Sequence, residues 1–597
     1  MALDYTGKEG VATSIGHAPV SALIDPVAGS RNSIAEALTN IIWAPLKNGL
    51  QSVSLSANWM WPCNNEGEDA RLYQAVKAVS DFAIELGINV PTGKDSLSMK
   101  QVYKNEEVIA PGTVIISAAA PCKDVKKTVE PVLKKNGGSL YYINLSQDNY
   151  KLGGSSFNQI LCAVGSQAPT VKSASYLKTV FNTIQSLISE GKILAGHDVS
   201  SGGLITTLLE MCFADLDLGA SINLSSIEED DLVKILFSEN AGIVFQAADD
   251  IRIEEVLSSN AITYKKIGHV TDDELLQITH HKQQLLFHIP EMRDIWYHTS
   301  YLLDSHQSGS RCARERFDNY KNQALQFKFP ENFLGRFPVL PKGKRIRAAV
   351  IREKGSSGER EASYMLHAAG FDVKDIHMTD LIQGDEDLKD IQFLVASGGF
   401  SNSDILGGGK GWAAGFLFNP KAKKALEDFF EREDTLSLGI NNGCQLFLEL
   451  GLIHPEDGEK PRLEVNKSKK FESVFTTVKI QKNPSVMLSS LAGSTLGIWA
   501  AHSEGRFRFP KGETDYNIVA KYAFSKLPSN PNGSDFNAAM VCDKTGRHLV
   551  MMPQMDRSAF PWNWACYPED RINDKVSPWL EAFVNARNWL TEKNKII

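Results

Sequence analysis

Apolar residues recur along most of the chain with two periods, one typical of helices and one typical of strands. Apolar positions three or four residues apart predict amphipathic helices, whereas short runs rich in β-branched residues predict strands. The helices expected from this pattern span residues 33–43, 70–86 and 359–369. The expected strands span residues 51–55, 113–120, 139–145, 346–351, 393–396 and 435–439. The alternation of helices and strands indicates α/β units.

Breaks in this pattern divide the chain into domains. The 597 residues are too many for one hydrophobic core. A charged, proline-containing stretch follows residue 122, and a polar, irregular stretch begins after residue 304. We therefore expect an α/β and α+β multidomain protein, with domains at 1–122, 123–304 and 345–597 and a linker at 305–344. In the last domain, the order of elements predicts a doubly wound parallel sheet.

Composition and charge narrow the classes of function. The net charge of −8 argues against a general nucleic-acid-binding protein, and no apolar run is as long as a membrane span. We expect neither nucleic acid nor membrane as a partner, but small anionic ligands at discrete sites. The eight cysteines show no paired spacing, so neither a disulfide framework nor a zinc site is indicated. A reducing cytoplasm is the expected location.

Cys444 lies where a predicted strand gives way to a predicted helix. The free N–H groups and the positive dipole end of a helix stabilise an anion, which would lower the pKa of a thiol placed there. The preceding Gly443 would permit a tight turn that exposes the sulfur, as in the nucleophile elbow of hydrolases. The alternative is a buried structural cysteine, a common fate of this residue. The residues alone leave both interpretations open.

Two segments carry residues suited to magnesium and phosphate. Glu36 and Asn40 are four residues apart in a predicted helix, so that their oxygens lie on one face. Asp198 and Ser200 precede a second helix, where the carboxylate could bind Mg²⁺ and the hydroxyl could contact phosphate. The alternatives are a solvated polar face for the first pair and a helix cap for Asp198.

Two glycine-containing segments could also hold an anion. In 93–99, a glycine turn is expected to present Lys94, Ser96 and Ser98 to phosphate, although the spacing of a Walker A loop is absent. The segment 152–156 is a glycine–serine turn whose backbone N–H groups could form an anion nest. Ordinary capped turns are the alternative for both.

The ordered set of these segments resembles large-type phosphoribosylformylglycinamidine synthase. The segments that resemble its second synthetase repeat are Glu36-Ala-Leu-Thr-Asn40, Leu55-Ser-Ala-Asn-Trp59, Gly93-Lys-Asp-Ser-Leu-Ser98 and His197-Asp-Val-Ser-Ser-Gly-Gly203. The resemblance continues through Gly398-Gly-Phe-Ser-Asn-Ser-Asp404, Gly411-Trp412, Asn442-Gly-Cys-Gln445 and Ala501-His-Ser-Glu-Gly-Arg506. It covers nearly the whole chain and implies aminoimidazole ribonucleotide synthetase-like domains followed by a class I glutaminase domain.

The resemblance implies ATP- and glutamine-dependent conversion of formylglycinamide ribonucleotide to formylglycinamidine ribonucleotide in purine biosynthesis. In that family ATP activates the amide oxygen as an iminophosphate, and ammonia from the glutaminase domain displaces phosphate. By motif, Glu36, Asn40 and Asp198 match magnesium ligands of a bound nucleotide, and Ser200 matches a nucleotide contact. The implied cofactors are therefore Mg²⁺ and ATP.

For the last domain, the resemblance implies that Cys444 is the glutaminase nucleophile. Backbone N–H groups near Gly399 and Gln445 would stabilise the oxyanion. The family places its histidine base and its carboxylate in a Pro-His-Pro-Glu-Arg motif, where this chain has Gln554 and Asp556. A glutamine amide does not titrate near neutral pH, so we expect a weakened glutaminase.

Two histidines could replace the missing base. His502 lies in one of the family-like segments and His548 lies six positions before Gln554, but each has a simpler interpretation as a structural histidine. Rescue by either is the less favoured prediction.

Full-length members of the family also have an N-terminal segment, a linker domain and a first synthetase repeat, which this sequence lacks. It therefore resembles the C-terminal half, and we expect it to pair with the N-terminal half of the same enzyme or with itself. The favoured hypothesis is an enzyme portion that uses ammonium better than glutamine. The alternative is a non-catalytic, nucleotide-binding scaffold half.

Overall fold

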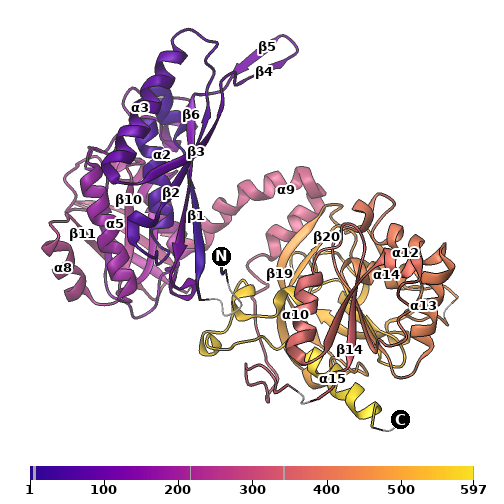
Figure 1. Ribbon diagram of the computed structural model, residues 1–597. Helices are drawn as coiled ribbons and strands as arrows, with labels where there is room; N and C mark the ends of the chain where they lie inside the picture. Colours follow the sequence, from indigo (N-terminus) through magenta and orange to yellow (C-terminus); the bar gives the residue numbers. More distant parts are fainter. Residues whose placement is uncertain (4–7, 216, 341–342, 457, 596–597) are drawn as a thin grey trace. The chain divides into compact units, whose positions relative to one another are not determined.

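The computed structural model describes two compact units. It covers residues 1–3, 8–215, 217–340, 343–456 and 458–595. The units are Met1–Trp296 and Tyr297–Ile597, and each is described by itself (Figure 1).

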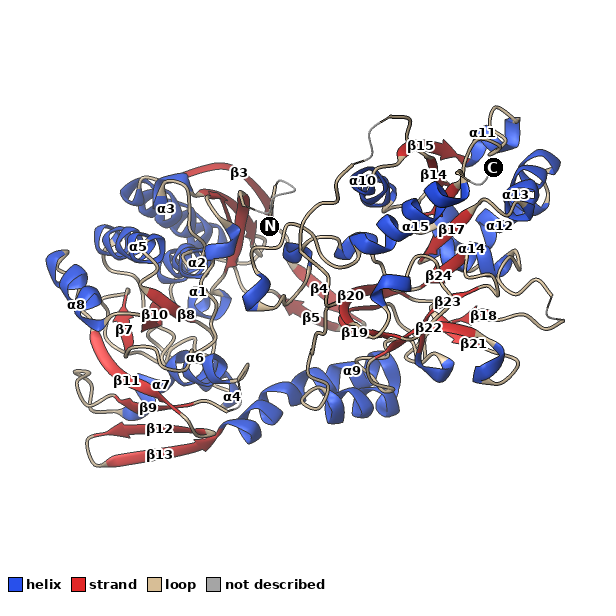
Figure 2. Cartoon of the chain, turned by 90° about the horizontal axis from the view of Figure 1, so that it is seen from below, coloured by secondary structure: helices blue, strands red, loops and turns tan. Residues whose placement is uncertain are grey.

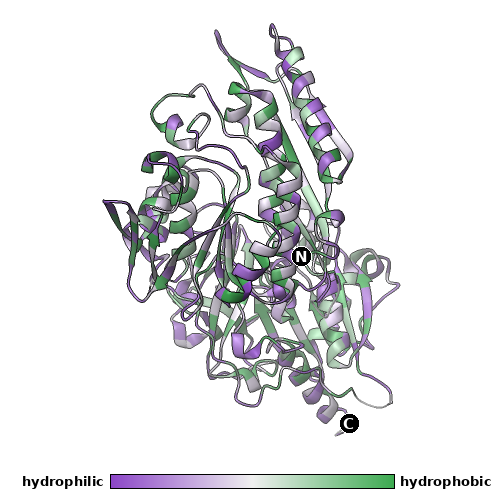
Figure 3. Cartoon of the chain, turned by 90° about the vertical axis from the view of Figure 1, so that its left-hand side faces the viewer, coloured by the Kyte–Doolittle hydropathy of each residue, from purple (hydrophilic) through white to green (hydrophobic). Residues whose placement is uncertain are grey.

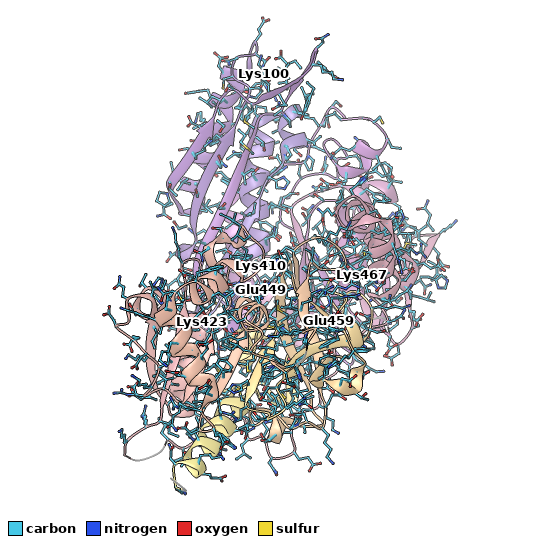
Figure 4. The ribbon with its side chains drawn as sticks, turned by 90° about the vertical axis from the view of Figure 1, so that its right-hand side faces the viewer. Lys100, Lys410, Lys423, Glu449, Glu459 and Lys467 are labelled. Carbon is cyan, nitrogen blue, oxygen red and sulfur yellow. The ribbon has the colours of Figure 1, made fainter. Side chains whose placement is uncertain are left out.

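The first unit begins with a four-stranded sheet of strand order β1, β6, β2, β3. Its strands are β1 (Gly10–Gly16), β2 (Ser54–Met60), β3 (Asn89–Ser96) and β6 (Thr113–Cys122), and the accompanying helices are α1 (Pro19–Ile24), α2 (Pro26–Ile41) and α3 (Glu68–Leu86). Helix α2 begins where the Asp25 carboxylate accepts hydrogen bonds from the backbone N–H groups of Val27 and Ala28. Its apolar side, which includes Ile34 and Leu38, is buried in the core. A hairpin of β4 (Lys100–Tyr103) and β5 (Glu106–Ile109) follows β3, and Figure 4 labels its first residue.

A seven-stranded sheet completes the first unit, in the order β13, β12, β9, β11, β7, β10, β8. Its strands are β7 (Leu140–Asn144), β8 (Ile193–Val199), β9 (Gly219–Asn223), β10 (Gly242–Ala247), β11 (Lys265–Thr271), β12 (Leu275–His280) and β13 (Gln283–His288). Its helices are α4 (Ser156–Ile160), α5 (Ala174–Ser189), α6 (Gly203–Cys212), α7 (Leu232–Phe237) and α8 (Asp250–Ser259). Neighbouring residues of β7 enter different cores: Tyr141 packs with α2 and α5, and Tyr142 packs with α6. Figure 2 shows α2, α3 and α5 side by side.

Helix α9 (Ile289–Asn319) contains the boundary between the two units and is kinked at Gly309. It occupies the first part of the stretch expected to be a linker. In its C-terminal part, Arg316 pairs with Asp304 and Glu472, and Glu315 pairs with Lys467. Figure 4 labels Lys467. The proposed domain boundaries remain predictions.

The second unit contains a nine-stranded sheet of order β15, β14, β16, β17, β24, β23, β22, β19, β20. Its strands are β14 (Arg347–Arg352), β15 (Asp372–His377), β16 (Phe393–Ala396), β17 (Leu436–Ile440), β19 (Glu472–Ile480), β20 (Thr495–His502), β22 (Asn517–Tyr522), β23 (Ala538–Cys542) and β24 (His548–Met551). A separate pair is formed by β18 (Arg462–Glu464) and β21 (Arg506–Arg508). The helices are α10 (Glu359–Ala369), α11 (Met378–Gln383), α12 (Lys410–Leu417), α13 (Pro420–Glu431), α14 (Asn442–Glu449) and α15 (Leu580–Lys593).

Helices cover both faces of this sheet. In β14, Val350 packs with the α10 and α15 side, and its neighbour Ile351 packs with the α11 to α14 side. The strands from β15 to β24 pair in parallel, whereas those from β24 to β20 pair antiparallel. The α/β multidomain fold is thus confirmed, and the parallel sheet extends over five of nine strands.

The hydrophobic periodicity located several elements closely. Helix α10 and strand β16 have the bounds expected from the sequence. Figure 3 shows hydrophobic and hydrophilic residues on different sides of the helices, which is the pattern that made them predictable. In the part of the chain that the structure describes, none of the helices is long and apolar enough to cross a membrane.

Candidate functional site

Glu36 of α2 and Ser200, just after β8, meet in the first unit. The Ser200 hydroxyl donates a hydrogen bond to Oε1 of Glu36 at 2.5 Å. Burial, reinforced by the nearby carboxylate of Asp198, raises the pKa of Glu36 to about 7. The structure therefore brings together three of the residues that the sequence singled out.

Asp198 is buried at the end of β8, and its Oδ2 has no hydrogen-bond partner. Its Oδ1 lies 3.3 Å from Nδ1 of His197, whose Nε2 lies 3.1 Å from Glu210. Although burial opposes the charged form, hydrogen bonds to Asp198 and Glu210 raise the pKa of His197 to about 10. A buried carboxylate oxygen without a partner is a free ligand position for a cation.

A cavity of about 300 Å³ opens beside Glu36. Its polar lining includes Asn32, Ser156 and Glu239. The Glu239 carboxylate accepts hydrogen bonds from the backbone N–H groups of Ser156 at 2.7 Å and of Gly202 at 2.8 Å. The glycine–serine turn 152–156, which was expected to hold an anion, therefore directs the N–H group of Ser156 at an internal carboxylate. Sequence analysis missed Glu239, because no motif marks it.

The other predicted ligands lie outside this cavity. Asn40 is exposed and donates to the backbone oxygen of Glu36 at 3.0 Å. The expected turn at Gly93 is wrong, since this residue lies inside β3, where its missing side chain leaves room for the backbone oxygen of Ala57. Lys94 and Ser96 are on the same strand and hydrogen-bond to each other.

The residues present fit part of a magnesium site. Glu36 and Asp198 supply hard oxygen ligands, and the orphaned Oδ2 of Asp198 is the observation that supports a cation there. Among the described residues, however, no three His, Cys, Asp or Glu side chains are close enough together to hold a metal ion.

In the second unit, a sharp turn joins β17 to α14. Its strained residue is Asn441, with φ 53° and ψ −106°. The Asn441 side chain donates a hydrogen bond to the backbone oxygen of Ala501 at 2.8 Å. Gly443 has a different role from the one expected: a Cβ there would lie 2.1 Å from the carbonyl oxygen of Ala396, so glycine allows α14 to approach β16.

The expectation of an exposed, activated Cys444 thiol is wrong. Cys444 lies inside α14, is fully buried among apolar residues such as Phe447 and Ala396, and faces the core. Burial raises the pKa of its thiol well above the usual range. The expected oxyanion donor at Gln445 is also engaged, because its N–H bonds to the carbonyl oxygen of Asn441 at 3.1 Å.

The glycine pair expected to supply the oxyanion donor lies beside Asn441, and Asp556 lies beside Gly358. A Cβ on Gly398 would lie 3.3 Å from the Cβ of Asn441, and one on Gly358 would lie 3.0 Å from Oδ2 of Asp556. The next residue, Gly399, has a positive φ of 122°. Burial raises the pKa of Asp556 to about 7, and its Oδ1 has no partner.

The two histidines that could replace the base expected at Gln554 are both buried. His502 is buried, its pKa is lowered to about 4 by burial, and its Nδ1 is 3.2 Å from Oδ1 of Asn466. Burial also lowers the pKa of His548 to about 4, and Ser437 contacts its Nδ1 at 2.9 Å. His548 pairs with a residue four positions before the turn at Asn441, about 13 Å along the strand.

Sequence profiles of three domain families match the chain. They are an FGAR-AT PurM N-like domain at residues 1–121, the AIR synthase related C-terminal domain at 140–281, and a CobB/CobQ-like glutamine amidotransferase domain at 345–590.

Curated relatives match along 99% of the chain. A probable phosphoribosylformylglycinamidine synthase of Arabidopsis thaliana, described as chloroplastic/mitochondrial, is 39% identical over 44% of its own length. The Homo sapiens phosphoribosylformylglycinamidine synthase is 35% identical over 47% of its length. The chain therefore spans less than half the length of these relatives.

Solved structures match part of the chain. A Thermotoga maritima PurLQS structure matches 41% of this chain and 100% of its own, with 26% identity and a TM-score of 0.33. A T. maritima PurL complexed with FGAR matches 49% of this chain and 47% of its own, with 14% identity and a TM-score of 0.40.

Proposed function

We propose that this chain belongs to the phosphoribosylformylglycinamidine synthase family and takes part in the ATP-dependent amidation of formylglycinamide ribonucleotide in purine biosynthesis. The chain combines AIR synthase-like domains with a glutamine amidotransferase-like domain, the two kinds of domain that such a ligase needs. In this proposal it supplies the second synthetase repeat and the glutaminase-like domain, and a complementary half supplies the remainder.

The observation that carries the proposal is the meeting of Glu36, Asp198 and Ser200 beside a polar cavity. Glu36 and Asp198 would hold Mg²⁺, which would neutralise the phosphate charge of a bound nucleotide. The Ser200 hydroxyl, which is bonded to Glu36, would turn toward a phosphate oxygen. Because burial raises the pKa of Glu36 to about 7, part of the protein carries a proton on this carboxyl at neutral pH and would release it on taking up a cation.

Pairing of the synthetase-like unit is part of the proposal. The face of the four-stranded sheet away from α2 is open and is lined by small hydroxyl and apolar residues, with Ile15 59% exposed. An exposed apolar face of this kind favours contact with another synthetase-like unit, either from the N-terminal half of the enzyme or from a second copy. The cytoplasmic location remains a prediction.

Nucleotide binding gives a direct test of the site. Calorimetric titration of the chain with ADP and Mg²⁺ should show binding that weakens at least about tenfold in Glu36→Gln and Ser200→Ala, because each change removes one polar contact to cation or phosphate. Glu85→Gln, an exposed glutamate of α3, is the matched control and should bind as the parent does. Equal affinity in all four proteins would contradict the assignment of this cavity.

Synthesis tests the proposed reaction. The chain is combined with an N-terminal half of a relative, formylglycinamide ribonucleotide, ATP and Mg²⁺, with either ammonium or glutamine as the nitrogen source. We expect product with ammonium and much less with glutamine, because the position expected for the base carries Gln554. Equal rates with the two nitrogen sources would argue against a weakened glutaminase.

A further inference from the structure

The turn between β17 and α14 has the sequence Gly439-Ile-Asn-Asn-Gly443. A nucleophile elbow has a glycine two positions before and two positions after its reactive residue, and that residue sits on a strained strand-to-helix turn. Asn441 has both the glycine spacing and the strained turn, since its φ of 53° and ψ of −106° are unusual for a residue that is not glycine. Cys444, three positions later, has neither the glycine spacing nor strained dihedrals.

The residues around Asn441 also indicate that this turn is the site. Gly398, where the sequence predicts an oxyanion loop, is packed against the Cβ of Asn441. A Cβ on Gly358 would lie near both the Asp556 carboxylate and the backbone nitrogen of Gly398, so that the acidic residue and this loop are neighbours. Cys444 instead packs in the core on the α11 to α14 side of the sheet and is fully buried.

We propose that residue 441 is the nucleophile position of this domain and that Asn441 and Gln554 together leave it unable to cleave glutamine. Cleavage requires a thiolate sulfur to bond to the side-chain amide carbon of glutamine. The carbon–nitrogen bond then breaks, a protonated base gives its proton to the departing ammonia, and water hydrolyses the thioester. The carboxamide of Asn441 has no such sulfur, and the carboxamide of Gln554 neither accepts nor delivers the proton.

The proposal deepens the proposed function, because ammonia for amidation must then come from outside this domain. It rests on that function only in treating the domain as glutaminase-like. Its test measures glutamine hydrolysis by the chain alone, so failure of the reconstituted synthesis has no bearing on the result.

Glutamate release from glutamine by the full chain is compared with that of Gln554→His, Asn441→Cys and Asn441→Cys/Gln554→His. Glutamate release by the parent and by Gln554→His should equal that of protein-free buffer. The double variant should release glutamate at least about tenfold faster than this blank, because the loss of one residue from a related triad costs on the order of 10⁴ in rate. Activity in the parent or in Gln554→His alone would overturn the proposal. A double variant that melts normally yet stays at the blank would also overturn it.

Adding Cys444→Ala to the double variant identifies the working sulfur. Retention of at least half of the activity supports residue 441 as the nucleophile position, whereas a fall to the blank assigns the chemistry to Cys444.

A labelling experiment covers the case in which the double variant fails to fold. The native parent and the single variant Asn441→Cys are treated with iodoacetamide, and the labelled peptides are found by mass spectrometry. Label on residue 441 of the variant, with Cys444 unlabelled in both proteins, is the expected result. Label on Cys444 of the native parent, or none on residue 441, would overturn the proposal.

Discussion

At the scale of single residues, the two candidate sites each contain a carboxylic acid that is largely removed from water. Glu36 and Asp556 both have pKa values raised to about 7, and for both the largest cause is burial. They differ in their neighbours: Asp198 adds charge repulsion at Glu36, whereas Arg557 opposes the shift at Asp556. Glu36 is therefore the acid whose environment a cation would improve.

The stability of the first unit should depend on pH through the ionisation of Glu36. Its folded pKa is raised from 4.5 to about 7, so the protonated acid stabilises the fold below pH 4.5 and this contribution is lost as pH rises to about 7. Glu36→Gln should then gain stability relative to the parent as pH rises from 5 to 8, by up to about 3 kcal/mol. Thermal melting of Glu36→Gln, with Glu85→Gln as control, measures the difference. A pH-independent difference would show that Glu36 titrates normally.

At the scale of elements, sequence periodicity predicted the secondary structure better than the sites. The bounds of helix α10 could be predicted from the spacing of its apolar residues, because the local sequence pattern decides which side of a helix is buried. The role of Glu239 could not be predicted in this way, since its two amide donors come from turns 83 and 37 residues away. The sequence indicated a tight turn at Cys444 because cysteine is a common nucleophile, whereas the backbone dihedrals place the turn at Asn441.

The packing of α14 against β16 depends on Gly443. A methyl group there would lie 2.1 Å from the carbonyl oxygen of Ala396. Because this oxygen belongs to the backbone of β16, the clash is relieved only if the helix moves away from the sheet. Gly443→Ala should destabilise the second unit by about 1–3 kcal/mol or more. Gly458→Ala, at a position with no heavy atom within 4 Å, is the matched control. Urea unfolding curves that coincide for the two variants would contradict the close approach.

At the scale of the whole molecule, the two units differ in how many reactive or ligand-binding side chains their candidate sites carry. The first unit has acidic and hydroxyl groups around a cavity, while the second matches an amidotransferase domain family and has amides at the two positions proposed above for nucleophile and base. A domain can keep its fold without the activity, because function depends on the residues of the site and not on the fold. The proposed assembly partner of the first unit is another synthetase-like unit.

Self-association of the chain through the open sheet face can be tested with two isoleucines. Ile15 lies on that face and is 59% exposed, and Ile84 lies on α3 and is 73% exposed. If two copies pair through the open face, Ile15→Asp places like charges in a contact that excludes water, which weakens it, while Ile84→Asp leaves it intact. Light scattering at micromolar concentration should give the mass of a dimer for the parent and for Ile84→Asp, and that of a monomer for Ile15→Asp. A monomeric parent would contradict self-association. The complementary half of the enzyme would then be the proposed partner of the exposed apolar face.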